Sequence, residues 1–538
     1  MSRIYSFYGG IHDASVCFFE NGELKVALQE ERISRIKEGD GDYSFPLLSF
    51  QKIQEITGVE ISEADYVCTS TPTLYPYITE NLKGVNVREF PHHYCHAVST
   101  YYTSGFSGKC LMLSYDGGGD GNYGEVWLCE DGEMERVIAM PSHSFSSIAN
   151  LWSLATIFLG WKAHQDEGKV MGMSANGDDD EFLRKIIYQI LTEESDGHFS
   201  LTNPGTDLFS RFVFQHLENA GLLSSQKGRE NFAKAVQSVT EELMVSFVQD
   251  LHRKYPDHCK KIGLSGGLFH NVKMNQKINE LEFVEELYVV PFMGDEGVSF
   301  GAGLAMSKIL GEVNQPFKLD NCFYGIDYPD SYITSLLETR KEFSWDVANL
   351  DTISDLLASG NIIGLFNGKF EYGARALGGR SILCNPSNPE MHEKLNNKLG
   401  RNQVMPFAPA VLSEFSESIF YHGNKSKYSA EFMTICYTVK EDWQEKISAC
   451  FHRVDKTARP QLVNKETNTK FWEIIEAFRK KTGIPALLNT SFNGHGQPII
   501  DSPEQALEHL QNGTIDSLIL GSFLVNKKEQ KDEFRFEV

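Results

Sequence analysis

The sequence predicts an α/β protein in which a duplicated ATPase core is followed by a second α/β domain. An apolar strand that ends in a glycine- and acid-rich turn and continues into a hairpin occurs at residues 3–31 and again at residues 109–141. The two turns read GGIHDAS and DGGGDGN. Because recurrence of one supersecondary unit indicates internal duplication, we interpret these segments as the two halves of one ATPase core.

Local patterns predict the elements of the first half. Residues 3–9 form a strand, and residues 14–31 read as two strands about the Asn21-Gly22 pair, which favours a tight hairpin turn. Glycine-rich turns at the strand ends would let a ligand approach the backbone. The other predicted elements are helices over 146–160 and 229–256, and a strand, glycine turn and helix over 260–278.

Residues 312–350 lack strong periodicity and contain Pro316 and Pro329. We therefore place the domain junction there, with domains at residues 1–345 and 346–538. The second domain, of roughly 190 residues, has an ordinary size. Its predicted strands lie at 361–368, 436–442 and 485–492, and its predicted helices at 393–399, 469–483 and 503–513.

Composition excludes several classes of function. The 538 residues are 41% hydrophobic and 12% aromatic, as in globular proteins, and are too many for one ordinary core. A net charge of −23 opposes general nucleic-acid binding and suits an enzyme of small molecules. No apolar run could cross a bilayer and no signal peptide is evident, so we expect no membrane partner. Ten cysteines without a CxxC pair indicate a reducing cytoplasm.

Two stretches of the second half predict a pocket for a small phosphorylated substrate. Glycines let the backbone approach an anion, hydroxyl and amide groups donate hydrogen bonds, and guanidinium groups bind phosphate in a bidentate way. The alternative is that these arginines pair with surface acids, which are abundant in this chain. The candidate residues are Arg375, Arg380 and Ser381, then Arg401 and Arg459, and finally Asn489, Ser491 and Asn493.

A candidate metal site lies in the first half. His92 and His96 are four residues apart, which places both imidazoles on one face if the stretch is helical. Such a pair can bind one divalent ion with a carboxylate from elsewhere, and Asp116 or Asp295 could supply it, each at a strand end before glycines. Alternatively, the histidines only pack and the acids only cap helices. We expect His93 to pack or cap.

Nucleotide-binding and catalytic candidates lie on the glycine turns. His12 could accept a proton from an acceptor hydroxyl when its imidazole is neutral, or it is simply a loop histidine. Residues 30–32 read as a solvated charged face. The nucleotide candidates are Gly117, Gly118, Gly266, Gly267 and Asn271, with Lys169 as a further phosphate contact or a solvated side chain.

Taken in order, the motifs resemble those of the O-carbamoyltransferase family of antibiotic and nodulation-factor biosynthesis. The match runs nearly from end to end, and the joint order of the motifs is highly specific. The motifs are GGIHDAS, ALQEERISRIK, HHYCHA, SYDGGGDG, EGKVMGMSANG, SGGLFHN, GDEG, FEYGARALGGRSI, MPFAP, HRVDKTARPQ and TGIPALLNTSFNGHGQPI.

The resemblance implies an N-terminal domain like that of threonylcarbamoyl-transferring tRNA-modification proteins, in the actin/Hsp70/sugar-kinase fold, and a YrdC-like C-terminal domain. The YrdC-like half is expected to combine carbamoyl phosphate with ATP into carbamoyl adenylate, releasing phosphate and pyrophosphate. The N-terminal half is expected to transfer the carbamoyl group to an acceptor hydroxyl.

The resemblance also implies roles for residues. A metal, ferrous iron by preference, would be held by His92, His96, Asp116 and Asp295, with Mg²⁺ accompanying ATP. His12 would deprotonate the acceptor. Carbamoyl phosphate would be held by Arg375, Arg380, Arg459, Ser491 and Asn493. Gln497 and Lys456 depart from the family pattern, and only Arg401 is retained from the basic run before MPFAP.

The acceptor is not readable from the sequence. A hydroxyl of a small-molecule secondary metabolite is the default, and a hydroxymethyl nucleobase, including one within DNA, is an alternative that the net charge opposes.

Other functions compete with this hypothesis. A sugar-kinase-like phosphotransferase would leave the C-terminal domain without a role. A hydrogenase-maturation carbamoyltransferase would carry CxxC zinc fingers, and a binding module would show no turnover. We expect residues 74–89 and 177–230 to shape the acceptor pocket, and a homodimer is the default assembly.

Overall fold

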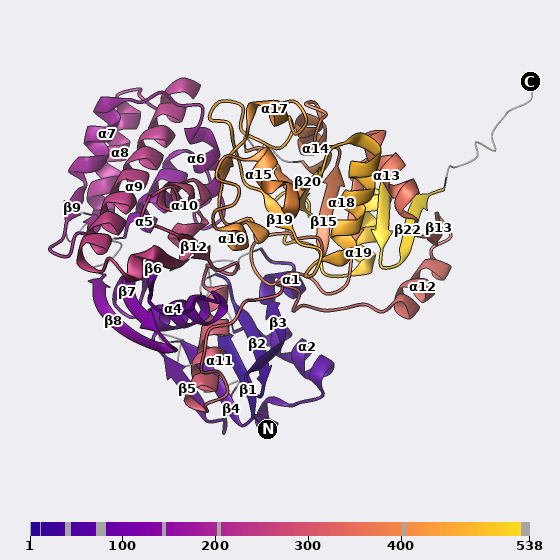
Figure 1. Ribbon diagram of the computed structural model, residues 1–538, viewed down its shortest axis with the longest axis horizontal. Coiled ribbons are helices and arrows are strands. Elements are labelled where there is room, and N and C mark those ends of the chain that lie inside the picture. The colour runs from indigo at the N-terminus through magenta and orange to yellow at the C-terminus, as the bar shows by residue number, and fades with distance from the viewer. Residues whose placement is uncertain are drawn as a thin grey trace, which may run out of the picture.

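The computed structural model describes residues 2–10, 12–37, 45–70, 82–142, 147–201, 206–400 and 405–528. These residues form a mixed α/β structure with two five-stranded sheets, one eight-stranded sheet and two two-stranded ribbons. Figure 1 shows the two N-terminal sheets at the bottom, a helical lobe at the upper left and the C-terminal part at the right. The C-terminal part therefore lies beside both the sheets and the lobe.

The first sheet has the strand order β3-β2-β1-β4-β5. The first three strands form an antiparallel meander, whereas β4 and β5 continue the sheet in parallel with β1. Asn21 and Gly22 both have positive φ, as the predicted tight hairpin turn requires. The strands are β1 (Arg3–Tyr8), β2 (Ser15–Glu20), β3 (Glu23–Gln29), β4 (Tyr66–Ser70) and β5 (Val87–Phe90).

The second sheet repeats this topology. Its order is β8-β7-β6-β11-β12, with an antiparallel meander of three strands followed by two parallel strands. Order and direction match the first sheet strand for strand, which confirms the predicted duplication. The strands are β6 (Cys110–Gly119), β7 (Asn122–Glu130), β8 (Glu133–Pro141), β11 (Lys261–Ser265) and β12 (Glu286–Val289).

Two helices fill the space between the sheets. Helix α4 (His92–Thr103) packs on β6 and β11, and α11 (Glu296–Ile309) packs on β1, β2 and β4. The two helices also pack on each other, and the crossing is close because a Cβ added at Gly301 would collide with the carbonyl oxygen of Cys95. Both α4 and α11 follow the last strand of their sheet, so they occupy equivalent places in the duplicated unit.

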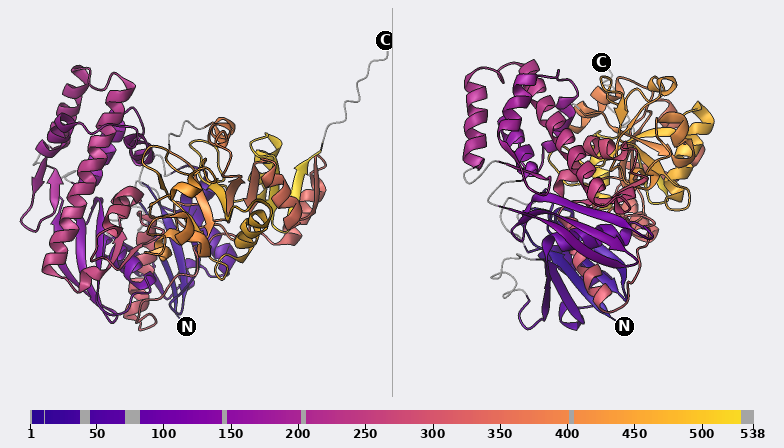
Figure 2. Two further views of the ribbon diagram at one scale, coloured as in Figure 1. Left: turned by 45° about the horizontal axis from the view of Figure 1, so that its top comes forward. Right: turned by 60° about the vertical axis from the view of Figure 1, so that its left-hand side comes forward.

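A helical lobe is inserted after β8, and it contains both helices predicted in this region (Figure 2). Helix α9 is 29 residues long and buries one face, including Phe232, Val236 and Leu243. The predicted helix over 146–160 is α5, and the predicted helix over 229–256 is α9. The helices of the lobe are α5 (Ile148–Phe158), α6 (Glu167–Ser174), α7 (Glu181–Gln189), α8 (Thr206–Asn219) and α9 (Gln226–Lys254). Helix α10 (Val272–Asn279) follows β11 and packs on α9.

The C-terminal part is built on the eight-stranded sheet, in the order β13-β22-β21-β14-β15-β20-β16-β19. Helices α13 (Leu350–Ala358) and α18 (Thr469–Thr482) pack on each other. The three helices predicted from the sequence are α14 (Met391–Leu399), α18 and α19 (Pro503–Gln511). The strands are β13 (Phe343–Val347), β14 (Ile363–Phe366), β15 (Arg380–Cys384), β16 (Ala408–Leu412), β19 (Gln461–Val463), β20 (Ala486–Ser491), β21 (Ser517–Leu520) and β22 (Phe523–Lys527).

Two sequence expectations differ from the structure here. The strand predicted over 436–442 is wrong for most of its length, because only β17 (Tyr437–Thr438) is extended and α17 (Glu441–Gln444) follows. Residues 312–350, which lack strong periodicity in the sequence and include the predicted junction, contain α12 (Asp330–Thr339) and β13. The predicted junction between residues 345 and 346 falls inside β13, which pairs with β22 of the C-terminal sheet.

A short helix of the C-terminal part, α16 (Lys427–Glu431), docks on the edge strand β12 of the N-terminal part. The backbone N–H of Leu287 donates to Ser426 Oγ at 2.8 Å, and that of Val289 donates to Ser429 Oγ at 3.0 Å. Side-chain hydroxyls thus satisfy donors that the edge strand would otherwise expose. The two parts of the chain are therefore joined by ordered polar contacts.

All ten cysteines are buried and free, as expected for a chain without structural disulfides. Within the described ranges, no helix has both the length and the apolar character that a membrane span requires.

Candidate active site

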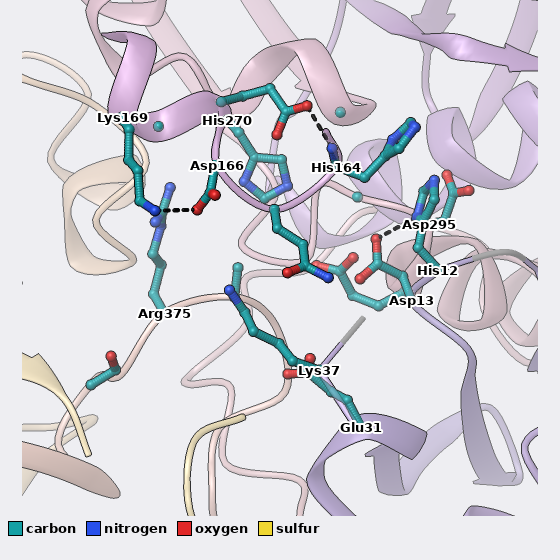
Figure 3. Close-up of a pocket in the computed structure, with 18 of the residues that line it drawn as sticks. His12, Asp13, Glu31, Lys37, His164, Asp166, Lys169, His270, Asp295 and Arg375 are labelled. Carbon is teal, nitrogen blue, oxygen red and sulfur yellow. Dashed lines mark hydrogen bonds and ion pairs between the residues drawn. The ribbon is translucent and has the colours of Figure 1, made fainter. Parts of the chain in front are cut away.

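One cavity of about 1040 Å³ lies between the N-terminal and C-terminal parts, and it is lined by residues of both. Figure 3 shows Arg375 and Lys169 toward one end of the cavity and His12, Asp13 and Asp295 toward the other. The two candidate centres of the sequence therefore share one space. The predicted residues that line it are His12, Asp116, Gly117, Gly118, Lys169, Gly267, Asn271, Asp295, Arg375, Arg459, Asn489, Ser491 and Asn493.

Four predicted metal ligands meet beside this cavity, and two of them, Asp116 and Asp295, line it. His92 and His96 lie on the first turns of α4, Asp116 lies near the end of β6, and Asp295 directly precedes α11. One ligand atom from each residue lies within 4.8 Å of the others. His96 Nε2 is 3.4 Å from Asp116 Oδ2 and 3.5 Å from Asp295 Oδ1. The duplicated fold thus brings together residues that are about 200 positions apart in sequence.

The donor atoms fit a divalent cation. His92 Nε2, His96 Nε2 and Asp295 Oδ1 are buried and have no hydrogen-bond partner among the described residues. Two ligands bound about 2.1 Å from one ion are separated by roughly 3.0–3.4 Å, close to the spacings found here. Imidazole and carboxylate donors together suit several divalent metals. Tyr8 Oη donates to Asp295 Oδ2 at 2.6 Å and so orients this carboxylate.

His93 has the packing role that the sequence predicted. Its Nδ1 is 3.1 Å from Ser114 Oγ, and its Nε2 is 3.2 Å from the carbonyl oxygen of Asn122. Burial, together with the neighbouring His92 and His96, lowers the pKa of His93 to about 3. The ring is therefore neutral, and it points away from the metal ligands toward β6 and β7.

His12 is held on its turn by two neighbours. Its Nδ1 is 3.0 Å from Asp13 Oδ2, and its ring stacks on His164 with the ring centroids 5.1 Å apart. Burial lowers the pKa of His12, but the hydrogen bond and the charge of Asp13 outweigh burial and raise the pKa to about 10. The contact with Asp13 occupies Nδ1, so Nε2 is the ring nitrogen that remains for another partner.

Glu296 is a further acidic residue that the sequence reading missed. It is buried, lines the cavity next to Asp295, and has no hydrogen-bond partner for Oε1 among the described residues. Burial, and then the charge of Asp13, raise the pKa of Glu296 well above its usual value. The GDEG motif indicated Asp295, but nothing in the motif indicated that the adjacent Glu296 would also be buried beside the cavity.

Arg375 and Arg459 both line the cavity on the side of the C-terminal part. The Nε atoms of both are buried without a partner, and within the described ranges neither guanidinium forms a hydrogen bond or an ion pair. Burial and the charge of Arg459 lower the pKa of Arg375, and burial lowers that of Arg459. Two like charges held together without a counter-charge are expected to bind an anion. Ser491 Oγ donates to Asn493 Oδ1 at 2.6 Å on the neighbouring loop.

Arg380 and Ser381 belong to the same motif as Arg375 but do not line this cavity. The Arg380 side chain is fully buried and donates from Nη1 to the carbonyl oxygens of Gly368 and Gly379, each at 2.9 Å. Its guanidinium carbon also lies 3.5 Å from the Phe366 ring centroid. Ser381 Oγ accepts a hydrogen bond from Gly378 N at 3.0 Å. Both residues shape the loop, and Arg401 lies outside the described residues.

The nucleotide candidates have mixed placements. Gly267 N donates to Asp116 Oδ2 at 3.1 Å, so this turn supports the metal ligands. Gly266 does not line the cavity: its φ is +100°, and an added Cβ would collide with the carbonyl oxygen of Tyr115. Asn271 caps α10 and pairs with Gln237, and Lys169 Nζ lies 2.8 Å from Asp166 Oδ1.

Residues 30–32 are not the solvated face that the sequence suggested. The Glu30 carboxylate accepts hydrogen bonds from the N–H groups of Leu48 and Ser49, at 3.0 and 2.8 Å, at the start of α2 (Leu47–Thr57). Arg32, on helix α1 (Glu30–Ser34), is 1% exposed and lines the cavity. The charge pattern of residues 30–32 could not reveal that Arg32 is buried, because Arg32 contacts Gly373, which lies more than 300 residues away in the C-terminal part.

Two segments, residues 74–89 and 177–230, were expected to shape the acceptor pocket, and residues 74–81 lie outside the described residues. Of the described residues between 177 and 230, and likewise between 82 and 89, none lines the cavity. Its wall on the lobe side is formed by α5 and the loop to α6, including Asn150, Trp152, Ser153 and His164. This wall lies close to His12, which stacks on His164.

Comparisons with known proteins identify the family of the chain. The family model described as carbamoyltransferase N-terminus matches residues 77–304, and the model described as carbamoyltransferase C-terminus matches residues 354–527. The uncharacterized protein MJ1051 of Methanocaldococcus jannaschii is 32% identical over 96% of this chain and 98% of its own length. Nodulation protein NolO of Bradyrhizobium diazoefficiens is 31% identical over 81% of this chain and 79% of its own.

Likeness to solved structures is weaker. A crystal structure of full-length HypF in its phosphate- and nucleotide-bound form aligns with a TM-score of 0.34 and 14% identity, over 57% of this chain and 46% of HypF. These values carry no argument about function. The assignment depends on the two family models, which together span most of the sequence, and on relatives matched over most of their length. The chain therefore belongs to the carbamoyltransferase family and is a carbamoyltransferase.

Proposed function

We propose that this carbamoyltransferase is ATP-dependent, forms carbamoyl adenylate from carbamoyl phosphate and ATP, and transfers the carbamoyl group to a hydroxyl of a small-molecule secondary metabolite. The observation that carries the proposal is the single cavity lined at one end by Arg375 and Arg459 and at the other by His12 and Asp295. An activated intermediate made at the first end would reach the second without entering bulk water. That arrangement would protect a labile acyl adenylate from hydrolysis.

In the activation step, Arg375 and Arg459 would bind the phosphate of carbamoyl phosphate, with Ser491 and Asn493 beside it. The Ser491 hydroxyl, which donates to Asn493 Oδ1 here, would turn to donate to the phosphate. Water would cleave the bond between the carbamoyl group and phosphate, giving carbamate and inorganic phosphate. A carbamate oxygen would then attack the α-phosphorus of ATP, and pyrophosphate would leave. The unpaired guanidinium groups support this role, since they provide positive charge where phosphate charge must be stabilised.

In the transfer step, the acceptor hydroxyl would attack the carbamoyl carbon, and AMP would leave with the electron pair of the broken C–O bond. The hydroxyl proton would pass to Nε2 of a neutral His12, which Asp13 holds by its Nδ1. The glycine turn at Gly117 and Gly118 would let the nucleotide approach the backbone. A pKa of about 10 favours the charged form of His12, so the neutral base would become more abundant as the pH rises.

We further propose that His92, His96, Asp116 and Asp295 hold ferrous iron. When bound, such an ion would supply Lewis-acid polarisation of the carbamoyl carbonyl and neutralise phosphate charge. The unpaired donor atoms support the presence of a cation. We also propose an actin/Hsp70/sugar-kinase fold for residues 1–345, supported by the repeated sheet topology, and a YrdC-like fold for residues 346–538.

The decisive experiment incubates the protein with ATP, carbamoyl phosphate and ferrous iron in the presence of candidate alcohols. Mass spectrometry should detect an acceptor that has gained one carbamoyl group, together with AMP, phosphate and pyrophosphate. Appearance of ADP with a phosphorylated acceptor would instead identify a phosphotransferase and refute the proposal. Omission of the acceptor should leave carbamoyl phosphate-dependent release of phosphate intact.

A further inference from the structure

We propose that Gln29 and Arg32, which belong to the N-terminal part, are positioning residues for the activation of carbamoyl phosphate at the C-terminal end of the cavity. They bind the peptide groups of Gly373, two residues before Arg375, and so fix the loop that carries this arginine. The inference rests on the proposed function, and it adds residues that neither the motifs nor the comparisons assign to that step.

The geometry of the contact is specific. The backbone N–H of Gly373 donates to Gln29 Oε1 at 3.1 Å, and its carbonyl oxygen accepts a hydrogen bond from Arg32 Nη2 at 2.8 Å. The loop is also tight at this point, because Gly373 has a φ of +111° and an added Cβ would lie 2.9 Å from the carbonyl oxygen of Pro291. The N-terminal part therefore binds both peptide groups of Gly373 and packs closely against this residue through Pro291.

Burial makes these hydrogen bonds effective. Gln29 is 3% exposed and Arg32 is 1% exposed, so water cannot replace either partner. Arg32 Nε lies 3.4 Å from Glu31 Oε1, which balances the buried charge. Loss of one side chain would leave a polar peptide group of Gly373 without a partner in a buried place, and this desolvation cost would displace the loop.

Neighbouring contacts anchor the same loops. The Tyr372 side chain is buried in the N-terminal part, where its hydroxyl donates to the carbonyl oxygen of Glu296 at 2.5 Å. Arg35 donates to the carbonyl oxygens of Ile499 and Pro498 at 2.7 and 2.8 Å. One short segment, residues 29–35, thus binds both loops that build the anion site.

Arg375 depends on this support more than most side chains would. Its guanidinium makes no hydrogen bond or ion pair within the described ranges, so only its backbone and its packing place it in the cavity. A misplacement of about 1 Å in a binding group can lower catalytic efficiency on the order of 100-fold. The activation step should therefore require the N-terminal part, although its chemistry takes place on C-terminal residues.

Four variants of the full chain test the inference: Gln29→Leu, Gln29→Glu, Arg32→Met and, as a matched control, Arg253→Met on the exposed surface of α9. Carbamoyl phosphate-dependent release of phosphate is measured without acceptor, and KM is determined separately for carbamoyl phosphate and for ATP. We expect Gln29→Leu and Arg32→Met to raise KM for carbamoyl phosphate at least ~10-fold and leave KM for ATP within about 2-fold. Gln29→Glu keeps an acceptor for Gly373 N–H and should restore most of the wild-type value.

Metal content and melting temperature are measured on each variant, so that a folding defect is recognised. If Arg32→Met does not fold, Gln29→Leu alone decides the test, because this substitution removes no charge and changes the size of the side chain little. Wild-type KM for carbamoyl phosphate in Gln29→Leu, or an equal rise for both substrates, would overturn the inference. Absence of phosphate release in the wild-type protein would instead refute the proposed function, which is a distinct result.

Discussion

His92 Nε2 lies 3.4 Å from Asp295 Oδ1, and neither atom has a hydrogen-bond partner among the described residues. His92 begins α4 and Asp295 precedes α11, and these helices are equivalent in the duplicated unit. The candidate metal centre therefore lies where the two copies meet. An ion bound there would join them, and its occupancy should influence stability as well as chemistry.

The first prediction concerns metal removal. A chelator should lower the melting temperature, because a ligand present at 100 times its dissociation constant stabilises the folded state by about 2.7 kcal/mol. His92→Ala should bind substantially less metal and lose most of this chelator-dependent shift. Differential scanning calorimetry and metal analysis measure both effects. His258→Ala, outside the centre, is the control, and an unchanged shift in His92→Ala would contradict the assignment.

The second prediction links helix packing to the same centre. Gly301→Ala places a methyl group against the carbonyl oxygen of Cys95 and must move α11 away from α4. We expect a loss of about 1–3 kcal/mol in the free energy of unfolding, the usual cost of overpacking. Metal affinity should fall too, since His92 and His96 lie on α4 and Asp295 directly precedes α11. Gly168→Ala, in a helix where an added Cβ meets nothing within 4 Å, is the control.

Local pattern was sufficient to predict most of these elements. The Asn21-Gly22 hairpin and helix α9 depend on residues that are neighbours in sequence, and both were confirmed. Strand β13 was missed because its pairing with β22 is decided almost 200 residues away. Asp116 and Asp295 were alternatives in the residue pattern, whereas the fold brings both to the same histidines.

The arginine loop shows the limit of motif reading. Arg375 and Arg380 lie five residues apart in one glycine-rich motif, and the motif alone gives both the same role. In the structure, backbone carbonyl groups surround Arg380, while Arg375 opens on the cavity. Gly373, two residues before Arg375, is hydrogen-bonded by Gln29 and Arg32 of the other part of the chain. No pattern within the motif contains that information.

The third prediction concerns the anion site. Arg459→Met removes one of two neighbouring positive charges, and the remaining Arg375 loses the repulsion that lowers its pKa. Without phosphate, the melting temperature of Arg459→Met should equal or exceed that of the wild-type protein. Inorganic phosphate should then stabilise the wild-type protein but not the variant, and affinity measured by calorimetry should fall at least ~10-fold. Equal phosphate affinity in both proteins would show that the anion binds elsewhere.

The fourth prediction separates the two proposed half-reactions. His12→Gln should slow carbamoyl transfer to an alcohol by about 10²–10⁴-fold, the usual contribution of a general base, and should leave phosphate release unchanged. Asp13→Asn removes the charge that raises the pKa of His12, so neutral His12 persists at lower pH. The acid limb of its pH–rate profile for transfer should therefore move to lower pH. A profile identical to that of the wild-type protein would exclude His12 as the titrating base.

The fifth prediction concerns the pH dependence of stability at the contact between the two parts. Burial, opposed in part by Lys318 and by Asn464, raises the pKa of Glu431 on α16 to about 7. Because the folded state holds this proton more tightly, the stabilisation is complete below pH 4.5, the ordinary pKa, and is lost as the pH rises through about 7. A tenfold difference in proton affinity is worth about 1.4 kcal/mol, and partial exposure reduces the effect, so we expect a loss on the order of 1–2 kcal/mol.

Glu431→Gln cannot ionise and should remove this loss. Its free energy of unfolding, measured with urea, should exceed that of the wild-type protein by more at pH 8 than at pH 5. Glu417→Gln, at an exposed carboxyl that pairs with Lys427, is the matched control and should show no such trend. A difference between Glu431→Gln and the wild-type protein that stays constant from pH 5 to pH 8 would mean that Glu431 titrates normally. The docking of α16 on β12 would then be independent of its protonation, because the hydrogen bonds of Ser426 and Ser429 carry no charge.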